Sequence, residues 1–158
     1  MQKFHINHLT LVHYDCFLQA EPQPVASAVK SVLHVDDEKL QCIVMSKILK
    51  ACEVVAVVSE TDGSKGLDAM QRNEFDLVIA DLEMSTMDGR EMMIAFRAWE
   101  EAEAGRPRRQ RVVSLTGAEE DRVSDEELLE AGFDEVVRKP VTKAKINALL
   151  HRGGKRVN

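Results

Sequence analysis

Three aspartates follow apolar runs of the chain and could together bind a cation. Asp36 and Asp37 come directly after Val32–Val35, and Asp81 comes directly after Leu77–Ala80. If these runs are neighbouring parallel strands, the carboxylates converge, and two unit charges about 4 Å apart repel by roughly 4 kcal/mol at an effective dielectric near 20. Mg²⁺ can offset that repulsion, because it prefers carboxylate, carbonyl and water oxygens and leaves positions for a phosphoryl group. The acids therefore predict a magnesium-dependent site for phosphoryl chemistry.

A threonine and a lysine follow two further apolar runs. Thr116 comes after Val112–Leu115, and Lys139 lies shortly after Val136–Val137. An aspartate such as Asp81 can be the nucleophile in phosphoryl transfer, while a metal ion and a lysine stabilise charge on the equatorial oxygens. Taken singly, these residues have plainer explanations, since acids before a helix are often caps. The prediction rests on all of them standing at successive strand ends.

Strands and helices alternate in the predicted structure that positions these side chains. Five apolar runs have the length and β-branched content of strands buried on both faces: Val32–Val35, Val54–Val58, Leu77–Ala80, Val112–Leu115 and Val136–Val137. Apolar residues at helical spacing follow each run, and those after the first run are Leu40, Ile43, Val44 and Ile48. Because crossovers between parallel strands are right-handed, helices must cover both faces of the sheet. The predicted fold class is α/β, with a doubly wound, five-stranded parallel sheet.

Length, composition and charge restrict the function classes. The chain has 158 residues, of which 44% are hydrophobic and 30% are charged, so one globular domain with a short extension is expected. The formal net charge is −6, the wrong sign for binding nucleic acid or an anionic membrane surface. No apolar run approaches the roughly 18 residues that a membrane-spanning helix needs. We expect no direct nucleic-acid partner and no membrane attachment.

Three segments are expected along the chain. Residues 1–30 carry no net charge and are typical of an N-terminal extension and linker, without the uninterrupted apolar stretch of a signal peptide. Residues 31–151 hold all the predicted strands and helices and form the domain. Residues 152–158 form a C-terminal tail, so no effector domain is expected within this chain.

Cysteines, histidines and arginines add no second site to the prediction. The three cysteines contain no C-x-x-C pair, which favours a reducing compartment, the cytoplasm or also the nucleus, over a disulfide framework or a zinc site. His34 lies within a predicted strand and is assigned no role. His5, His8 and His13 could bind a metal, but an edge strand or a tail is favoured. The arginines between residues 106 and 111 are expected in a solvated loop rather than in a phosphate-binding patch.

The sequence resembles the receiver domain of two-component response regulators, in the CheY-like superfamily, over roughly residues 31–151. Four segments carry the resemblance: VLHVDD at residues 32–37, LVIADLEMSTMDG at residues 77–89, VSLTG at residues 113–117, and Lys139-Pro140. Each segment is short, but their order and spacing together are specific. The resemblance implies a flavodoxin-like sheet with strand order 2-1-3-4-5.

The resemblance also implies a role for each site residue. Asp81 would accept a phosphoryl group from a phosphohistidine, while Thr116 and Lys139 would contact the phosphoryl oxygens. The groups implied to hold Mg²⁺, directly or through water, are Asp36, Asp37, Asp81 and the backbone carbonyl of Glu83. The Lys139-Pro140 peptide bond would be cis.

Three features depart from the receiver pattern. Ser85 stands where receivers usually have proline, which implies a looser loop after Asp81. Val136 stands where many receivers place a switching aromatic residue, so movement of Thr116 cannot be coupled to an aromatic rotamer here. Glu83 and Ala118 occupy positions that tune the lifetime of the phosphoryl group in the family.

The expected function is that of a phosphoacceptor signalling domain and not of an enzyme. A histidine kinase or histidine phosphotransfer protein would supply phosphate, and the helix after the fourth strand, with the fifth strand, would bind an unidentified output protein. At most, the domain would phosphorylate itself from small donors and dephosphorylate itself. It could be a stand-alone receiver, a phosphorelay shuttle or a module of a hybrid kinase.

Two alternative functions stay open at this point. The first is a receiver-like interaction module that never uses phosphate, which the departures at Ser85 and Val136 suggest. The second is a Mg²⁺-dependent phosphatase with an aspartate nucleophile. That class resembles an Asp-x-Asp pattern rather than adjacent Asp36-Asp37, so turnover of phosphate esters is not expected.

Overall fold

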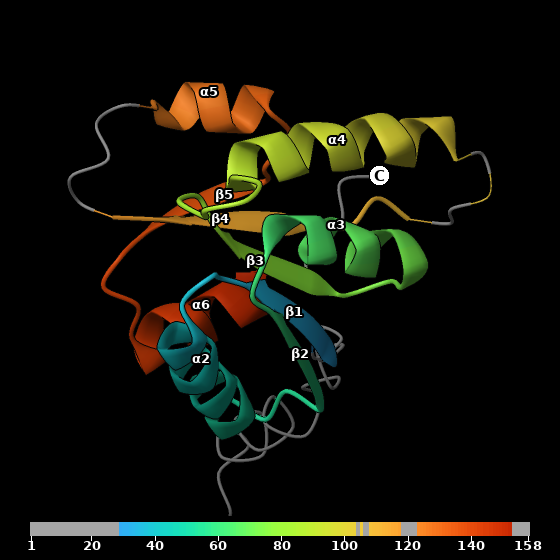
Figure 1. The fold of residues 1–158 in the computed structure, drawn as a ribbon. Coiled ribbons are helices and arrows are strands. Elements are labelled where there is room, and N and C mark those ends of the chain that lie inside the picture. Colours follow the sequence, from blue (N-terminus) through green and yellow to red (C-terminus); the bar gives the residue numbers. More distant parts are fainter. Residues whose placement is uncertain (1–28, 104, 106–107, 118–122, 153–158) are drawn as a thin grey trace, which may run out of the picture.

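Five strands alternate with five helices in the part of the chain that the computed structural model describes, residues 29–103, 105, 108–117 and 123–152 (Figure 1). The strands are β1 Ser31–Val35, β2 Ala56–Glu60, β3 Leu77–Asp81, β4 Val112–Thr116 and β5 Glu135–Arg138. The helices are α2 Lys39–Ala51, α3 Gly63–Arg72, α4 Gly89–Ala102, α5 Asp125–Glu130 and α6 Lys143–Arg152. The alternation predicted from the apolar runs is confirmed.

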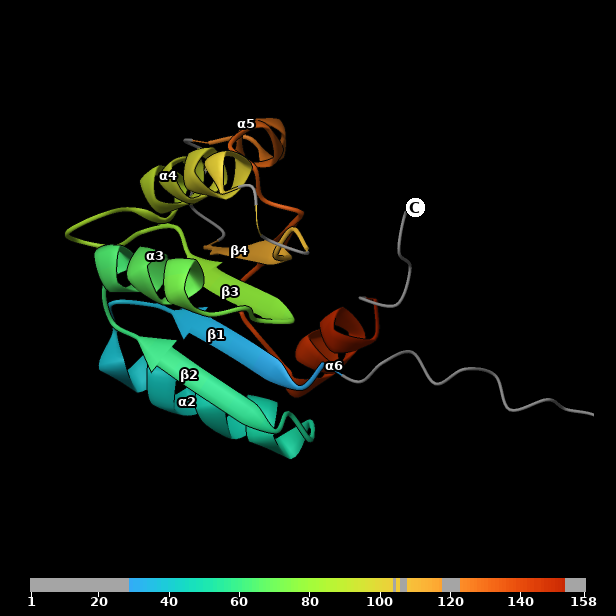
Figure 2. The same ribbon diagram turned by 90° about the vertical axis from the view of Figure 1, so that its right-hand side faces the viewer.

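All five strands are parallel and lie in the order β2-β1-β3-β4-β5, as predicted. Helices α2 and α6 cover one face of the sheet, and α3, α4 and α5 cover the other (Figures 1 and 2). The register sets Val35 opposite Ala80 and Asp81 opposite Leu115. The carboxyl ends of β1, β3 and β4 therefore meet at one edge of the sheet, where the candidate site residues stand.

An apolar layer on each face of the sheet fixes the central strands. Leu33 and Val78 belong to the layer under α3 and α4, whereas Val32 and Ile79 belong to the layer under α2 and α6. They alternate because successive side chains of a strand point to opposite faces. All five residues of β3 are buried. Since burial of a large apolar side chain stabilises by about 1.5–3 kcal/mol, the strand that ends at Asp81 is firmly held.

The two outer strands are less buried than the sequence predicts. The apolar run suggests a strand over Val54–Val58 buried on both faces, but β2 begins two residues later and its residues are exposed or half-buried. Val54 is buried in the turn after α2, whereas Val55 is 82% exposed. Strand β5 is half-buried and ends in an exposed residue. Both strands lie at the edges of the described sheet, so less of each is covered by neighbours.

Helix α2 turns a different face to the sheet from the one its apolar spacing suggests. Leu40, Ile43 and Val44 are 69%, 53% and 44% exposed. The buried residues of the helix are Cys42, Met45 and Leu49. Their three- and four-residue spacing also makes a continuous stripe along one face of a helix. The helix is confirmed, and it leaves an apolar face uncovered by the described residues.

The helix ends also differ in detail from the sequence expectation. Asp62 is the N-cap of α3, and its carboxylate accepts a hydrogen bond from the Ser64 backbone N–H. Glu38 is the N-cap residue of α2, so the plainer explanation of the two preceding acids as helix caps is wrong. Gly132 follows α5 with φ 109°, a conformation that favours glycine and is common just past a helix end.

The arginines at the end of the sheet remote from the site are held by carboxylates. Arg97 in α4 is 9% exposed and donates to Glu100, to Asp134 and to the carbonyl of Gly132. Further ion pairs join Arg108 to Asp76, Arg109 to Asp134 and Arg111 to Glu135. The side chains of Arg108 and Arg109 are 53% and 54% exposed, which agrees with the predicted solvated loop, whereas that of Arg111 is only 21% exposed.

Some expectations fall on parts of the chain that are not described. These are most of the N-terminal extension with His5, His8 and His13, then Arg106 and Ala118, and most of the C-terminal tail. Among the described helices, none has both the length and the apolar character needed to cross a membrane.

Candidate functional site

Asp81 closes β3, and its carboxylate contacts a lysine. Asp81 is 5% exposed, and its Oδ1 accepts hydrogen bonds from Lys139 Nζ at 2.8 Å and from the Leu82 backbone N–H at 3.0 Å. Lys139 directly follows β5 and precedes a cis peptide bond to Pro140, as the resemblance implies. Its backbone N–H donates to the carbonyl of Thr116 at 2.7 Å. The ends of β3, β4 and β5 thus bring Asp81, Lys139 and the Thr116 backbone together.

Asp36 lies at the end of β1 and is even more buried than Asp81. It is 1% exposed, and its Oδ1 accepts a hydrogen bond from the Glu38 backbone N–H at 2.9 Å. Burial raises the pKa of Asp36 to about 6; the hydrogen bond from Glu38 opposes this rise, and the negative charge of Asp81 adds to it. The charge of Lys139 also favours the carboxylate of Asp36. Two acids therefore interact with one lysine, which leaves an excess of negative charge.

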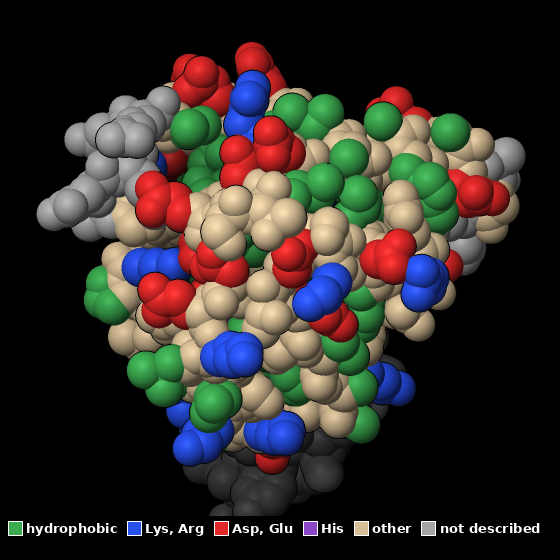
Figure 3. Space-filling model, in the orientation of Figure 1, with side chains coloured by type: hydrophobic (Ala, Val, Ile, Leu, Met, Phe, Trp, Pro, Cys, Tyr) green, Lys and Arg blue, Asp and Glu red, His purple; other side chains and the backbone are tan. Residues whose placement is uncertain are grey.

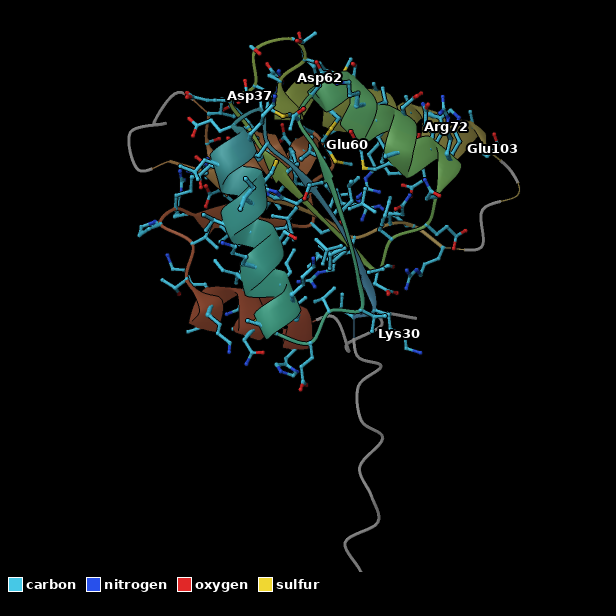
Figure 4. The ribbon with its side chains drawn as sticks, turned by 60° about the horizontal axis from the view of Figure 1, so that its bottom comes forward. Lys30, Asp37, Glu60, Asp62, Arg72 and Glu103 are labelled. Atoms are coloured by element: carbon cyan, nitrogen blue, oxygen red, sulfur yellow. The ribbon has the colours of Figure 1, made fainter. Side chains whose placement is uncertain are left out.

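Asp37 turns toward the loop between β3 and α4. Its Oδ2 accepts a hydrogen bond from the Ser85 backbone N–H at 2.9 Å. Proline has no N–H, so the serine at this position supplies a bond that proline could not. The sequence suggests a looser loop here, whereas the structure ties the loop to the start of α2. Figure 4 shows Asp37 at the same end of the sheet as Glu60 and at the opposite end from Lys30.

The donor chemistry of the site fits Mg²⁺, although the acids are arranged differently from the prediction. Among the described residues, no three His, Cys, Asp or Glu side chains lie together in a group that could hold a metal ion. Of the three predicted aspartates, Asp36 and Asp81 interact with each other, while Asp37 is bound to the loop through the Ser85 N–H. Mg²⁺ commonly takes one or two carboxylates and keeps several waters. Such an ion would offset the negative charges of Asp36 and Asp81, which interact with each other and with Lys139. Glu83 is exposed in the loop beside these acids.

Thr116 lies at the end of β4, where it contacts an arginine that the sequence reading does not single out. The threonine is 1% exposed, and its Oγ1 donates to the Gly117 carbonyl at 3.3 Å. Arg138, its partner in the β4–β5 register, donates from Nη1 to Thr116 Oγ1 at 3.4 Å. A basic residue directly before Lys139 is the signal that could have pointed to this contact.

Gly89 allows the loop after β3 to stay close to Asp81. It is the first residue of α4, and a Cβ at this position would lie 2.2 Å from the Asp81 carbonyl oxygen. Any other residue would push the start of α4 away from the end of β3. Asp88 caps the helix in a capping box with Glu91, which fixes where the helix begins.

His34 is the second residue that the sequence reading leaves without a role. It is 0% exposed, and neither ring nitrogen has a hydrogen-bond partner among the described residues. Its Nε2 lies 3.9 Å from Asp36 Oδ2, and it lines a cavity of about 330 Å³ with Lys139 and Pro140. Burial, followed by the charge of Lys139, lowers the pKa of His34 to about 4. The imidazole is therefore neutral at pH 7.

Acidic side chains also surround the site on the surface. In Figure 3, Asp and Glu side chains gather on the upper part of the visible face, around α5 and the start of α4. The first turn of α5 alone contains Asp125, Glu126 and Glu127. This arrangement does not suit the binding of a polyanion.

The fold and the site define a class of small α/β domains in which an acidic centre lies at the switch in strand order of a parallel sheet. Comparison with known proteins gives the family: residues 32–151 match the response regulator receiver domain. The chain belongs to the response regulator receiver family.

Relatives with this domain are signalling proteins. The chain is 33% identical over 127 residues to the sensor protein GacS of Pseudomonas syringae, and the match covers 78% of the chain and 13% of GacS. It is 29% identical over 126 residues to a probable chemotaxis protein CheY of Rhizobium etli, covering 80% of the chain and 92% of that protein. The chain therefore spans only a small part of the sensor protein and nearly all of the chemotaxis protein.

Solved structures of receiver domains share the fold. The receiver domain of sensor histidine kinase PA1611 from Pseudomonas aeruginosa, which has a magnesium ion in its active-site cleft, is 25% identical with a TM-score of 0.66, covering 79% of this chain and 97% of that one. The receiver domain of Ssk1 from Saccharomyces cerevisiae, solved with the histidine phosphotransfer protein Ypd1, is 18% identical with a TM-score of 0.71, covering 80% and 90%. The second likeness shows the fold alone.

Proposed function

We propose that Asp81 accepts a phosphoryl group from a phosphohistidine and that Asp36, Thr116 and Lys139 support the transfer. The observation that carries this proposal is the 2.8 Å contact between Lys139 Nζ and Asp81 Oδ1, beside the buried Asp36. An aspartate carboxylate can act as the nucleophile in phosphoryl transfer, and a lysine beside it can balance negative charge on the phosphoryl oxygens. Residues 31–151 form the domain, between the extension 1–30 and the tail 152–158.

The transfer forms a bond between a carboxylate oxygen of Asp81 and phosphorus and breaks the bond between phosphorus and the donor histidine nitrogen. Lys139 balances negative charge on the phosphoryl oxygens, and the Thr116 hydroxyl donates a hydrogen bond to one of them. The groups that would hold Mg²⁺ are Asp36, Asp37, Asp81 and the Glu83 carbonyl. When bound, the ion would offset charge on the phosphoryl group and the acids.

The phosphodonor docks on the exposed apolar face of α2. Leu40, Ile43 and Val44 form this face, and it begins three residues after Asp37. A contiguous exposed apolar patch is unusual on a protein surface and often marks an interaction site. The occupant is the histidine-bearing helical segment of a histidine kinase or a histidine phosphotransfer protein, because the reactive histidine must reach the adjacent acidic edge.

The output is binding of another protein at α5 and β5, and not catalysis. Receiver domains are signalling domains, and self-phosphorylation from small donors with autodephosphorylation is the most that this site performs. The place of action is the cytoplasm, with the nucleus as a compatible alternative. The charge of −6 gives no basis for direct contact with nucleic acid.

The test is the intact mass of the protein after incubation with acetyl phosphate and Mg²⁺. The wild type should gain one phosphoryl group, and Asp81→Asn should gain none. Asp68→Asn, which alters an exposed acid on α3, is the matched control and should label like the wild type. Labelling of Asp81→Asn would contradict the proposal.

Two other outcomes would favour the rival functions. If neither acetyl phosphate nor beryllofluoride changes the wild type in the presence of Mg²⁺, the chain is a phosphate-independent interaction module. Sustained release of phosphate from small esters, lost in Asp81→Asn, would instead identify a phosphatase.

A further inference from the structure

One arginine joins the phosphorylation site to the helix that follows it. Arg138 is the last residue of β5, and its Nη1 donates to Thr116 Oγ1 at 3.4 Å. Its Nη2 donates to Asp125 Oδ1 at 2.5 Å, and Asp125 is the first residue of α5. A single guanidinium thus bridges a hydroxyl of the site and the start of a helix on the expected output face.

Both contacts of Arg138 are weak enough for another partner to replace them. The side chains of Arg138 and Asp125 are 45% and 56% exposed, and ion pairs with this exposure contribute little to stability. The bond to Thr116 Oγ1 is long at 3.4 Å. The fold therefore does not depend on the bridge, and a stronger anion near Thr116 would compete for the guanidinium.

Helix α5 is suited to respond to such a change. It has six residues, and its one buried residue is Leu128. A cavity of about 490 Å³ lies between this helix and the loop after β3, lined by Met84, Ser85 and Leu128 among others. A short helix with one buried anchor and space beneath it can shift at little cost in packing.

The other residue of β5 that could couple to Thr116 has no polar group. Val136 is the other residue of β5 on the same face as Arg138, because one residue separates them and strand side chains alternate. The aliphatic side chain of Val136 cannot form a hydrogen bond to the Thr116 hydroxyl, so it cannot move with that hydroxyl. Arg138 can, because its planar guanidinium offers several donors at once.

We propose that Arg138 is the positioning residue that reports phosphorylation to α5. The inference rests on the proposed function, in which Asp81 carries the phosphoryl group. That group adds close to two negative charges beside Thr116, and arginine binds phosphate oxygens in a bidentate manner. Arg138 then leaves Asp125 for the phosphoryl group and Thr116, and the first turn of α5 loses its tie to β5.

The test is hydrogen–deuterium exchange of the α5 amides, residues 125–130, in the full chain with and without beryllofluoride and Mg²⁺. In the wild type, beryllofluoride should speed exchange of these amides by about two- to five-fold, as loss of one exposed ion pair allows. Arg138→Gln should exchange at the faster rate from the start and show no further change. Arg152→Gln is the matched control, because it removes another exposed ion pair of β5, to Glu135, and should behave like the wild type.

A second arm needs no phosphoryl mimic. Asp125→Asn should speed α5 exchange as much as Arg138→Gln does, and the double variant should add nothing, because both remove the same bridge. Uptake of phosphate from acetyl phosphate, followed by intact mass, should persist in Asp125→Asn and in Arg152→Gln.

The outcomes separate the two proposals. If the wild type takes up phosphate and Arg138→Gln keeps the full beryllofluoride response, or if the two single effects add, the role of Arg138 is overturned while the proposed function stands. If the wild type neither takes up phosphate nor responds to beryllofluoride, both proposals are overturned.

Discussion

The Nζ of Lys139 lies 2.8 Å from Oδ1 of Asp81, although the two residues come from opposite halves of the domain. The contact forms because β3 and β5 both flank β4 and end at the same edge of the sheet. The pKa of the neighbouring Asp36 is raised chiefly by burial and further by the charge of Asp81, while the charge of Lys139 opposes the rise. The balance of charge at this edge determines both the stability of the domain and its chemistry.

Asp36→Asn should stabilise the metal-free protein at pH 7.5. Because the pKa of Asp36 is raised from 3.8 to about 6 on folding, the unfolded chain loses this proton more easily, and stability falls as pH rises through that window. Asparagine avoids the penalty and can still accept the Glu38 hydrogen bond. Urea unfolding in EDTA should show a gain of about 1–3 kcal/mol. The gain should shrink as pH falls from 6 to 4, and a gain independent of pH would contradict this reasoning.

His34→Leu should raise the free energy of unfolding at pH 7 and should reduce the amount by which this free energy falls in acid. The pKa of His34 falls from 6.5 to about 4 on folding, so the unfolded chain binds a proton first as pH drops below 6.5. The wild type should therefore lose up to about 3 kcal/mol from this group between pH 6.5 and 4. The leucine variant also removes two buried nitrogens that have no hydrogen-bond partner among the described residues, and each such group costs about 1–3 kcal/mol of stability. Urea unfolding at pH 7 and 4.5 measures both effects, with the exposed His151→Leu as control.

Ser85→Pro should strengthen Mg²⁺ binding. The substitution deletes the N–H that holds Asp37 Oδ2 at 2.9 Å, so the carboxylate no longer has to leave a hydrogen bond to meet the ion. Removal of a competing bond of about 1 kcal/mol corresponds to several-fold tighter binding. The readout is the Mg²⁺ concentration that gives half the maximal rise in melting temperature. Ser85→Ala keeps the N–H and should match the wild type, and equal affinities for all three proteins would show that the bond does not oppose the metal.

Arg97→Met should destabilise the fold without affecting phosphate uptake. The arginine is bound to Glu100, Asp134 and the Gln110 carbonyl, and its removal leaves buried acceptors without a partner. Breaking a buried ion pair costs about 3–5 kcal/mol. Arg72→Met, which removes an exposed pair with Asp68, should cost little, and similar losses in both variants would argue against the buried network.

The order and type of the elements could be predicted from the sequence because each strand is a short apolar run and each helix has a regular apolar period. The face of α2 that packs on the sheet could not be predicted. Leu40, Ile43 and Val44 and the buried stripe of Cys42, Met45 and Leu49 both have helical spacing, and only packing on the sheet chooses between them. The burial of the outer strands cannot be predicted for a related reason. The apolar run Val54–Val58 does not reveal that β2 lies at an edge of the sheet, where its side chains are less covered.

The residues that meet at the candidate site could be predicted, but the hydrogen bonds and ion pairs between them could not. Strand-end positions identify Asp36, Asp81 and Lys139, which the fold brings together. The bond from Ser85 to Asp37 and the bridge from Arg138 to Thr116 depend on loop and side-chain geometry that residue types do not specify. Arg97 was missed because a charged residue in a helix is more often exposed than buried.

The most direct test of the central claim is to find which residue carries the phosphoryl group. Borohydride reduces an aspartyl phosphate to homoserine, so the protein labelled with acetyl phosphate and Mg²⁺ can be reduced, digested and sequenced by mass spectrometry. The account predicts homoserine at position 81 and at no other aspartate. Homoserine at position 36, 37 or elsewhere, or none in protein that has gained a phosphoryl group, would contradict it.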